Sequence, residues 1–117
     1  MTIRDERTAK IAALNDALRR DPATGEPGRI VMTRGVSELG IPFTLQALAK
    51  LKAFDTFTND NDPYGEHDFG SFELEGQKPF WKIDYYEKAS DYTAGAETPE
   101  NAETTDRLLT IMLAEEY

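Results

Sequence analysis

The chain has 117 residues, a formal net charge of −9 at pH 7, 39% hydrophobic residues and 30% charged residues, values that predict a single soluble domain over residues 1–117. Because the chain is strongly acidic, repulsion between its carboxylates and phosphates excludes direct binding of nucleic acid over a broad face. There is no cysteine, which excludes disulfides and thiolate metal sites and fits a reducing cytoplasm, and no apolar segment has the length of a signal peptide core or a membrane span.

A first helix is expected over residues 3–20. Its apolar residues Ile11, Leu14 and Leu18 recur at positions i, i+3 and i+7 of one helical face, and Thr2 is a suitable N-cap. The segment that follows, DPATGEPG, combines two prolines with two glycines. It is expected to be a connection between elements.

Residues 29–34 are expected to form the first strand. Three consecutive apolar residues, Ile30–Met32, favour a strand that is buried on both faces. Gly35 is expected to end this strand, and the glycine and proline within residues 36–42 predict a turn.

A second helix is expected to begin at Thr44 and to extend through residue 57. Leucines recur there at spacing i+3, which is typical of a packed helical face. The expected face consists of Leu45, Leu48 and Leu51, with Ala47 and Phe54 extending it.

Residues 69–88 are expected to form a β-hairpin. Phe72 and Leu74 alternate with polar residues, as in a strand with one buried face. A glycine at position 76 followed by Gln77 fits a two-residue type II′ turn. In the return strand we expect one set of side chains to face the helices together with Phe72 and Leu74, namely Trp81, Ile83 and Tyr85.

A last helix is expected after a polar loop over residues 87–98. Thr98 is a suitable N-cap, a proline follows it, and Leu108, Leu109 and Met112 supply an apolar face. The order of elements is therefore α-β-α-β-β-α. We expect an α+β fold in which helices pack on one face of a three-stranded antiparallel sheet.

The charge is distributed unevenly, and residues 59–70 are its most unusual part. Residues 1–54 contain nine Lys/Arg and six Asp/Glu, a net of +3, whereas residues 55–117 contain four and sixteen, a net of −12. The segment 59–70, NDNDPYGEHDFG, holds four acidic residues, two asparagines and the only histidine of the chain. Such asymmetry favours an interaction surface.

A metal site is one alternative for this segment. With Gly65 at the sixth position of a calcium loop, Asp60 falls at the first position, but Ser71 falls at the twelfth, where a bidentate glutamate is required. The EF-hand interpretation therefore fails. A weaker oxygen site for Ca²⁺ or Mg²⁺ stays open, with the carboxylates of Asp60, Asp62, Glu66 and Asp68 as its ligands.

An enzyme is a second alternative. His67 beside Asp68 or Glu66 could act as a general base, so that a metal-dependent or acid/base centre would include the same carboxylates. Since no nucleophile motif accompanies them, we assign no catalytic residue, expect no cofactor, and favour a protein that is not an enzyme.

The segment also carries the residues that a fixed turn requires. Asn59 is typical of an Asx-turn, Pro63 fixes its own φ, and Gly65 tolerates positive φ. His67 is expected to be partly buried and hydrogen-bonded to a nearby acid or to the backbone, where it would order the loop.

The functional hypothesis is a non-enzymatic module that binds another protein. Turn formation does not require so many carboxylates, which favours a cationic partner, and tyrosine is a common interface anchor. No membrane partner is expected, and the oligomeric state is left open. The residues expected to contact a basic protein surface are Asp60, Asp62, Tyr64, Glu66 and Asp68, with Glu115 and Glu116 at the C-terminus.

Four stretches of the sequence resemble a known family: MTRGV at 32–36, FDTFTNDNDPYGEHDFGSFE at 54–73, FWKIDYY at 80–86 and LLTIMLAEEY at 108–117. The family is a small bacterial domain of unknown function, found on proteobacterial chromosomes and plasmids, with a TxDNDPxGEHDFG-like core. The resemblance implies a bacterial cytoplasmic protein from mobile or accessory gene neighbourhoods, and it supplies no catalytic residues.

In that context, the basic partner is expected to be a nuclease or another nucleic-acid-binding complex. The chain would then act as a DNA mimic, an inhibitor of the anti-CRISPR or anti-restriction type. An accessory subunit of a larger complex is the remaining alternative.

Overall fold

The computed structural model describes residues 3–21 and 28–117, so the predicted cap Thr2 and most of the predicted connection lie outside the described residues. The chain folds as an α+β domain. Its elements are α1 (Ile3–Arg20), β1 (Gly28–Met32), α2 (Arg34–Ser37), α3 (Ile41–Ala53), β2 (Phe69–Ser71), β3 (Phe80–Glu87), β4 (Thr105–Met112) and a 3₁₀ turn, η2 (Ala114–Glu116). The first helix agrees with its prediction.

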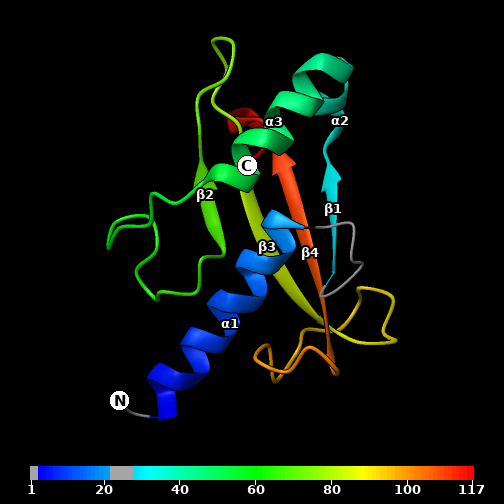
Figure 1. The fold of residues 1–117 in the computed structure, drawn as a ribbon. Helices are drawn as coiled ribbons and strands as arrows, with labels where there is room; N and C mark the ends of the chain where they lie inside the picture. Colours follow the sequence, from blue (N-terminus) through cyan, green and yellow to red (C-terminus); the bar gives the residue numbers. More distant parts are fainter. Residues whose placement is uncertain (1–2, 22–27) are drawn as a thin grey trace.

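The sheet has four strands in the order β1-β4-β3-β2. β4 pairs in parallel with β1 and antiparallel with β3, and β2 pairs antiparallel with β3. α1 and α3 lie on the same face of this sheet (Figure 1). The α+β class and the one-sided helices are therefore confirmed, whereas the three-stranded antiparallel sheet is wrong: the sheet is mixed and has a fourth strand.

The fourth strand replaces the predicted last helix. β4 is central in the sheet, with hydrogen bonds to β1 on one side and β3 on the other. Buried side chains recur at every second residue from Thr105 through Arg107 and Leu109 to Ile111, and Met112 at the strand end is buried as well. The two leucines and the methionine of this strand favour a helix, whereas its two threonines and its isoleucine favour a strand. The position between two strands decides the conformation.

The segment before β4 is a series of turns and not a helical first turn. The backbone N–H of Asn101 donates to the Thr98 carbonyl at 2.9 Å, and the Asn101 side-chain oxygen accepts from the backbone N–H of Glu103 at 2.9 Å. Asparagine commonly stabilises turns through such bonds. The signals interpreted as a helix start therefore belong to a loop that leads into a strand.

The first strand and second helix also differ from their predictions. β1 is an edge strand paired only with β4. None of its residues is fully buried and Arg29 is exposed, so the prediction of a strand buried on both faces is wrong. α3 begins at Ile41, three residues before the expected start, and buries Phe43, Ala47 and Leu51. Leu45 is 62% exposed, so it lies outside the packed face.

The hairpin prediction is confirmed for its buried face and wrong for its turn. Leu74 bridges to Gln77, so the central turn residues are Glu75 and Gly76, both with positive φ (51° and 78°). Positive φ at both positions is typical of a type I′ turn. On the predicted face, Trp81, Ile83 and Leu74 are buried, and Phe72 and Tyr85 pack against that core.

The core contains polar side chains as well as apolar ones. Leu18, Leu51, Trp81 and Leu109 are fully buried. Asn15, Arg19 and Arg107 are also 0–1% exposed, and such groups require hydrogen-bond partners to be tolerated in a core. Within the described ranges, no helix has the length and apolarity to span a bilayer.

The C-terminal residues do not continue a helix. The Glu116 carboxylate accepts hydrogen bonds from the Thr33 hydroxyl at 2.6 Å, from the Gly35 N–H at 3.1 Å and from the Leu113 N–H at 2.8 Å. These bonds lower the pKa of Glu116. This carboxylate therefore attaches the chain end to the start of α2.

Candidate functional site

The acidic loop is attached to the domain by a hydrogen-bond network around Asn15 of α1. The Arg107 Nε donates to Asn15 Oδ1 at 2.7 Å, and Asn15 Nδ2 donates to the Glu66 carbonyl at 2.9 Å and to the Tyr85 hydroxyl at 2.9 Å. The Tyr85 hydroxyl in turn donates to Glu66 Oε1 at 2.8 Å. One asparagine thus connects the helix, the loop and two strands.

Burial changes the acid–base properties of two members of this network. The Arg107 guanidinium is fully buried, lies 5.1 Å from the centre of the Tyr85 ring and also donates to the Pro99 carbonyl. Burial lowers the pKa of Arg107 and raises that of Tyr85. Near pH 7 an arginine is charged and a tyrosine is neutral, so these two groups serve as hydrogen-bonding and packing groups at neutral pH.

A second connection between loop and helix runs through His67. Its Nδ1 lies 3.0 Å from Asp16 Oδ1, while Arg19 Nη2 donates to that oxygen at 2.7 Å. The imidazole stacks on the Phe57 ring with centroids 3.9 Å apart and planes 2° apart. Its side chain is 30% exposed. The prediction that His67 is partly buried and bonded to an acid is confirmed.

The loop is also fixed from within. The His67 N–H donates to Asp62 Oδ1 at 3.2 Å, and the Gly65 N–H donates to the Asp62 carbonyl at 3.1 Å. The Thr58 N–H donates to Asn61 Oδ1 at 2.9 Å. Gly65 has φ 73°, as expected for a turn glycine, and His67 has φ 58°. A non-glycine residue in this region is uncommon, so the surrounding bonds hold it there.

Asp68 has the most perturbed carboxyl group of the loop. Burial, followed by repulsion from Glu66, raises its pKa to about 6. A pKa near neutrality suits a general acid or base. The cavity beside the loop, however, is lined by Glu66 and not by His67 or Asp68.

The predicted contact residues divide into exposed and internal groups. Asp60 is exposed and Tyr64 is 75% exposed, whereas Asp62 is 8% exposed and Glu66 and Asp68 are half-buried. Asn59 and Pro63 lie exposed on the same turn. Glu115 and Glu116 are exposed on η2, where Glu116 contacts the β1–α2 junction and not the loop.

The proposed oxygen-ligand set is not assembled as a metal site. Asp62 bonds to His67 and Glu66 bonds to Tyr85, so both carboxylates already have protein partners. In residues 3–21 and 28–117, no three His, Cys, Asp or Glu side chains converge in a way that could hold a metal ion.

Sequence reasoning missed the residues to which the loop is attached. These are Asn15, Asp16, Arg19, Tyr85 and Arg107. A signal was present on α1, because Ile11, Asn15 and Leu18 follow one another at i, i+4 and i+7 and therefore share one face. A polar residue on an apolar face indicates a buried partner, but the sequence does not identify that partner.

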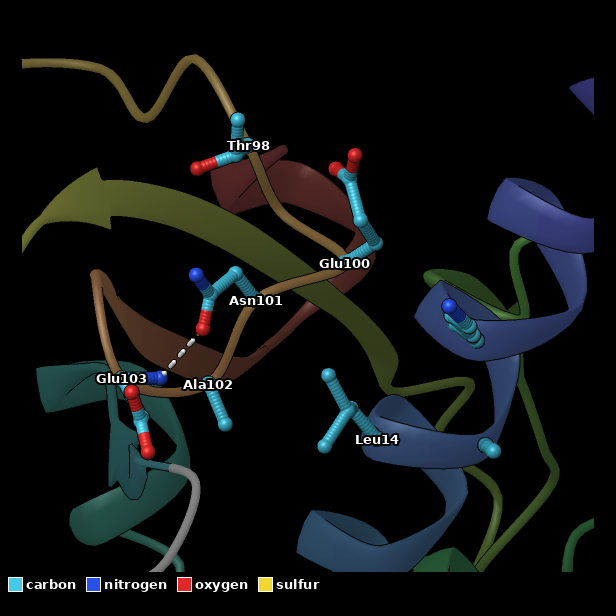
Figure 2. Close-up of a pocket in the computed structure, with 8 residues that line it drawn as sticks. Leu14, Thr98, Glu100, Asn101, Ala102 and Glu103 are labelled. Atoms are coloured by element: carbon cyan, nitrogen blue, oxygen red, sulfur yellow. Dashed lines mark hydrogen bonds between the residues drawn. The ribbon is translucent and has the colours of Figure 1, made fainter. Parts of the chain in front are cut away.

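Among the described residues, two hollows lie beside residues 5–14 of α1. One, of about 310 Å³, lies between the helix and the loop. The other, of about 670 Å³, lies between the helix and the turns before β4. In the second, the side chains of Leu14 and Ala102 point toward one another, and Thr98 and Glu100 lie at its rim (Figure 2). The acidic loop contributes only to the first hollow.

The model of the family described as Protein of unknown function (DUF3768) matches residues 32–116. The match includes the whole acidic loop and the strands β2, β3 and β4, and leaves out α1 and all of β1 except Met32. No curated protein matches this chain, and no solved structure does.

Proposed function

This chain belongs to the DUF3768 family, and we propose that it is a small non-enzymatic protein-binding module whose acidic loop docks on a basic surface of a larger protein. The observation that carries the proposal is that some side chains of the loop bond to the domain while others are exposed to solvent. Asp62, Glu66 and His67 bond inward, and Asp60 and Tyr64 extend into solvent.

A loop of this kind is pre-organised for recognition. Loops whose internal bonds fix them before binding lose less conformational entropy on association, which increases affinity without new contacts. An exposed tyrosine beside a carboxylate offers both an aromatic anchor and a charge, two features that are enriched at protein interfaces. The rigid backbone around Tyr64 therefore supports a binding role.

The charges around the loop favour a basic partner. Residues 55–117, which have a net charge of −12, contain sixteen acidic residues, and nine of these are exposed. Four of these lie on either side of β2 in the sequence, namely Asp55 and Asp60 before it and Glu73 and Glu75 after it. Complementary charge increases association rates and rejects acidic partners, which supports a positively charged docking surface.

In its finer form, the proposal places this function in the bacterial cytoplasm and names a nucleic-acid-binding surface as the target. A nuclease surface that binds phosphates would attract these carboxylates in the same way. The chain would thereby act as a DNA mimic of the anti-CRISPR or anti-restriction type. Duplex DNA would then compete with it for the target.

Affinity capture with matched variants tests the proposal. We expect the wild-type chain and the Leu45→Ser control, on exposed α3, to retain the same proteins from a host lysate. The Asp60→Asn, Tyr64→Ala variant should lose them, and capture should weaken as salt is raised, because salt screens exposed charges. Identical capture by the loop variant and the wild type would contradict the proposal.

The same assay separates the remaining alternatives. Capture that is insensitive to salt and to the loop variant would indicate an accessory subunit bound through another surface. A metal-dependent site would instead be revealed by thermal unfolding with Ca²⁺, Mg²⁺, Mn²⁺ or Zn²⁺. An ion that raises Tm in the wild type, and not in an Asp62→Ala, Glu66→Ala variant, would contradict the non-enzymatic proposal.

A further inference from the structure

We propose that the hollow between α1 and the acidic loop is a subsite for an arginine side chain of the partner, with its guanidinium stacked on Tyr64 and bonded to Glu66. This inference rests on the proposed function and extends it to a defined site and a defined ligand group.

The hollow has a suitable size and polarity for such a group. Its volume is about 310 Å³, whereas one water occupies about 30 Å³ in the liquid. α1 forms one wall, with the aliphatic Ile11 among polar residues, and the loop forms the other. The lining residues are Asp5, Arg7, Thr8, Ile11, Pro63, Tyr64 and Glu66.

Glu66 supplies the anionic group. One of its oxygens, Oε1, accepts from the Tyr85 hydroxyl at 2.8 Å, which fixes the carboxylate at the inner end of the loop. An ionised carboxylate has about four acceptor positions, so one tyrosine leaves acceptor capacity for an incoming cation. The Glu66 side chain is thus oriented by the protein, and half-buried, where an added charge-assisted bond is stronger than in bulk water.

Arg7, the basic residue that already lines the hollow, bonds to groups outside it. Arg7 Nε donates to Glu100 Oε1 at 3.0 Å, and its Nη2 donates to the Glu97 carbonyl at 3.2 Å. Both acceptors belong to the loop before β4. Arg7 therefore lines the hollow while its guanidinium bonds elsewhere, which leaves Glu66 for a second cation.

Tyr64 supplies the face on which a guanidinium can stack. Its ring is 75% exposed, and its backbone lies between Pro63 and Gly65 in a turn closed by the Gly65 N–H to the Asp62 carbonyl. Arginine suits this arrangement better than lysine, because a planar guanidinium can stack on an aromatic ring while it donates two bonds to a carboxylate.

Amide chemical shifts of the full chain test the subsite directly. The probe is N-acetyl-arginine amide, titrated against the corresponding citrulline and lysine compounds. We expect saturable shifts, at millimolar probe, at the amides of Thr8, Tyr64 and Glu66. Citrulline, which replaces the guanidinium by a neutral urea, should produce none, and lysine should bind about threefold more weakly.

Two variants assign the binding to the proposed groups. Tyr64→Ala should weaken arginine binding about threefold, and Glu66→Gln about tenfold. Glutamine can still accept from Tyr85, so the loop should stay folded, and the wild-type Tm checks this. Tyr64→Phe, which keeps the ring, is the matched control and should bind arginine as the wild type does.

The outcomes separate this subsite from the proposed function. Equal shifts with citrulline, or arginine binding unchanged by Tyr64→Ala, would overturn the subsite. If no arginine binding occurs but Asp60→Asn, Tyr64→Ala still abolishes protein capture, the subsite fails and the proposed function stands. If arginine binds as expected while that variant captures the same proteins as the wild type, the proposed function fails.

Discussion

At the scale of single residues, His67 shows how a charged loop is held on a folded domain. It contacts Asp16 of α1 through Nδ1 and stacks on Phe57, while its own N–H bonds to Asp62. His67 therefore links the acidic segment to α1 through its imidazole and fixes the turn through its backbone N–H. These contacts give His67 a structural role, which is to fix the loop against α1.

Removing the imidazole should therefore weaken the loop and lower global stability. We expect His67→Ala to reduce the free energy of unfolding by about 1–3 kcal/mol, the usual cost of losing a partly buried hydrogen bond and its packing. Urea denaturation measures it. Asp60→Asn, in the same loop but exposed, is the control and should change stability by less than about 0.5 kcal/mol. Equal midpoints for His67→Ala and wild type would contradict this role.

Asp68 predicts a specific pH dependence. Burial and the neighbouring Glu66 raise its pKa to about 6 from the usual 3.8. The folded state then binds a proton more tightly than the unfolded state, so stability should fall as pH rises from about 4 to about 6. Asp68→Asn removes this loss.

The Tm of Asp68→Asn relative to wild type should accordingly increase between pH 4 and pH 7. Thermal unfolding of both proteins across this range measures the difference, with Asp60→Asn as the exposed control. A difference that stays constant with pH would show that Asp68 does not titrate as its surroundings predict.

At the scale of elements, β4 is the strand that holds the sheet together. It pairs in parallel with β1 and antiparallel with β3, so it connects the N-terminal strand β1 to the hairpin strands β2 and β3. Gly28 illustrates how closely β1 approaches: a Cβ at that position would lie 2.1 Å from the Arg107 carbonyl oxygen. Only glycine fits this contact without a shift of the backbone.

The alternation along β4 predicts opposite sensitivities for two adjacent leucines. Leu109 is fully buried among the helices and strands, and Leu108 is half-buried on the other face of the sheet. We expect Leu109→Ala to cost about 2–5 kcal/mol of unfolding free energy and Leu108→Ala about 1 kcal/mol. Guanidinium denaturation of both variants measures this contrast, and equal losses would be inconsistent with a strand in this register.

At the scale of the whole molecule, Asn15 joins parts of the chain that are far apart in sequence. It bonds to Arg107, 92 residues away, to Tyr85, 70 residues away, and to the Glu66 carbonyl, 51 residues away. The family model begins at residue 32, so the helix that carries Asn15 lies outside the matched region and still completes its buried polar network.

Loss of this side chain should therefore affect α1 and the loop together. Asn15→Ala leaves the buried Arg107 Nε without its acceptor, and we expect a cost of about 3 kcal/mol. Hydrogen exchange should show faster exchange at the loop amides of Asp62 and Gly65 as well as in α1. Ala13→Ser, exposed on the same helix, is the control. Unchanged exchange at Asp62 and Gly65 would separate the loop from the network.

The sequence alone was sufficient for the features that depend on local pattern. It predicted the extent of α1, since an amphipathic helix is specified by its own periodicity, and the inward face of β3, because strand alternation is local. It also located the acidic loop and the partial burial of His67. The family of unknown function was recognised from the same stretches that the family model matches.

Only the tertiary structure decided β4 and the attachment of the loop. The residues of β4 mix helix-favouring leucines and a methionine with strand-favouring threonines and an isoleucine, and they form a strand because β1 and β3 satisfy their backbone hydrogen bonds on both sides. The partners of His67 and Glu66 lie about 20 to 50 residues away in sequence. Contacts over such separations depend on the folded geometry. The periodicity of a helix or strand can show which face a residue such as Asn15 or Tyr85 occupies, but it does not identify the partner, which is why the network with Arg107 was found only in the structure.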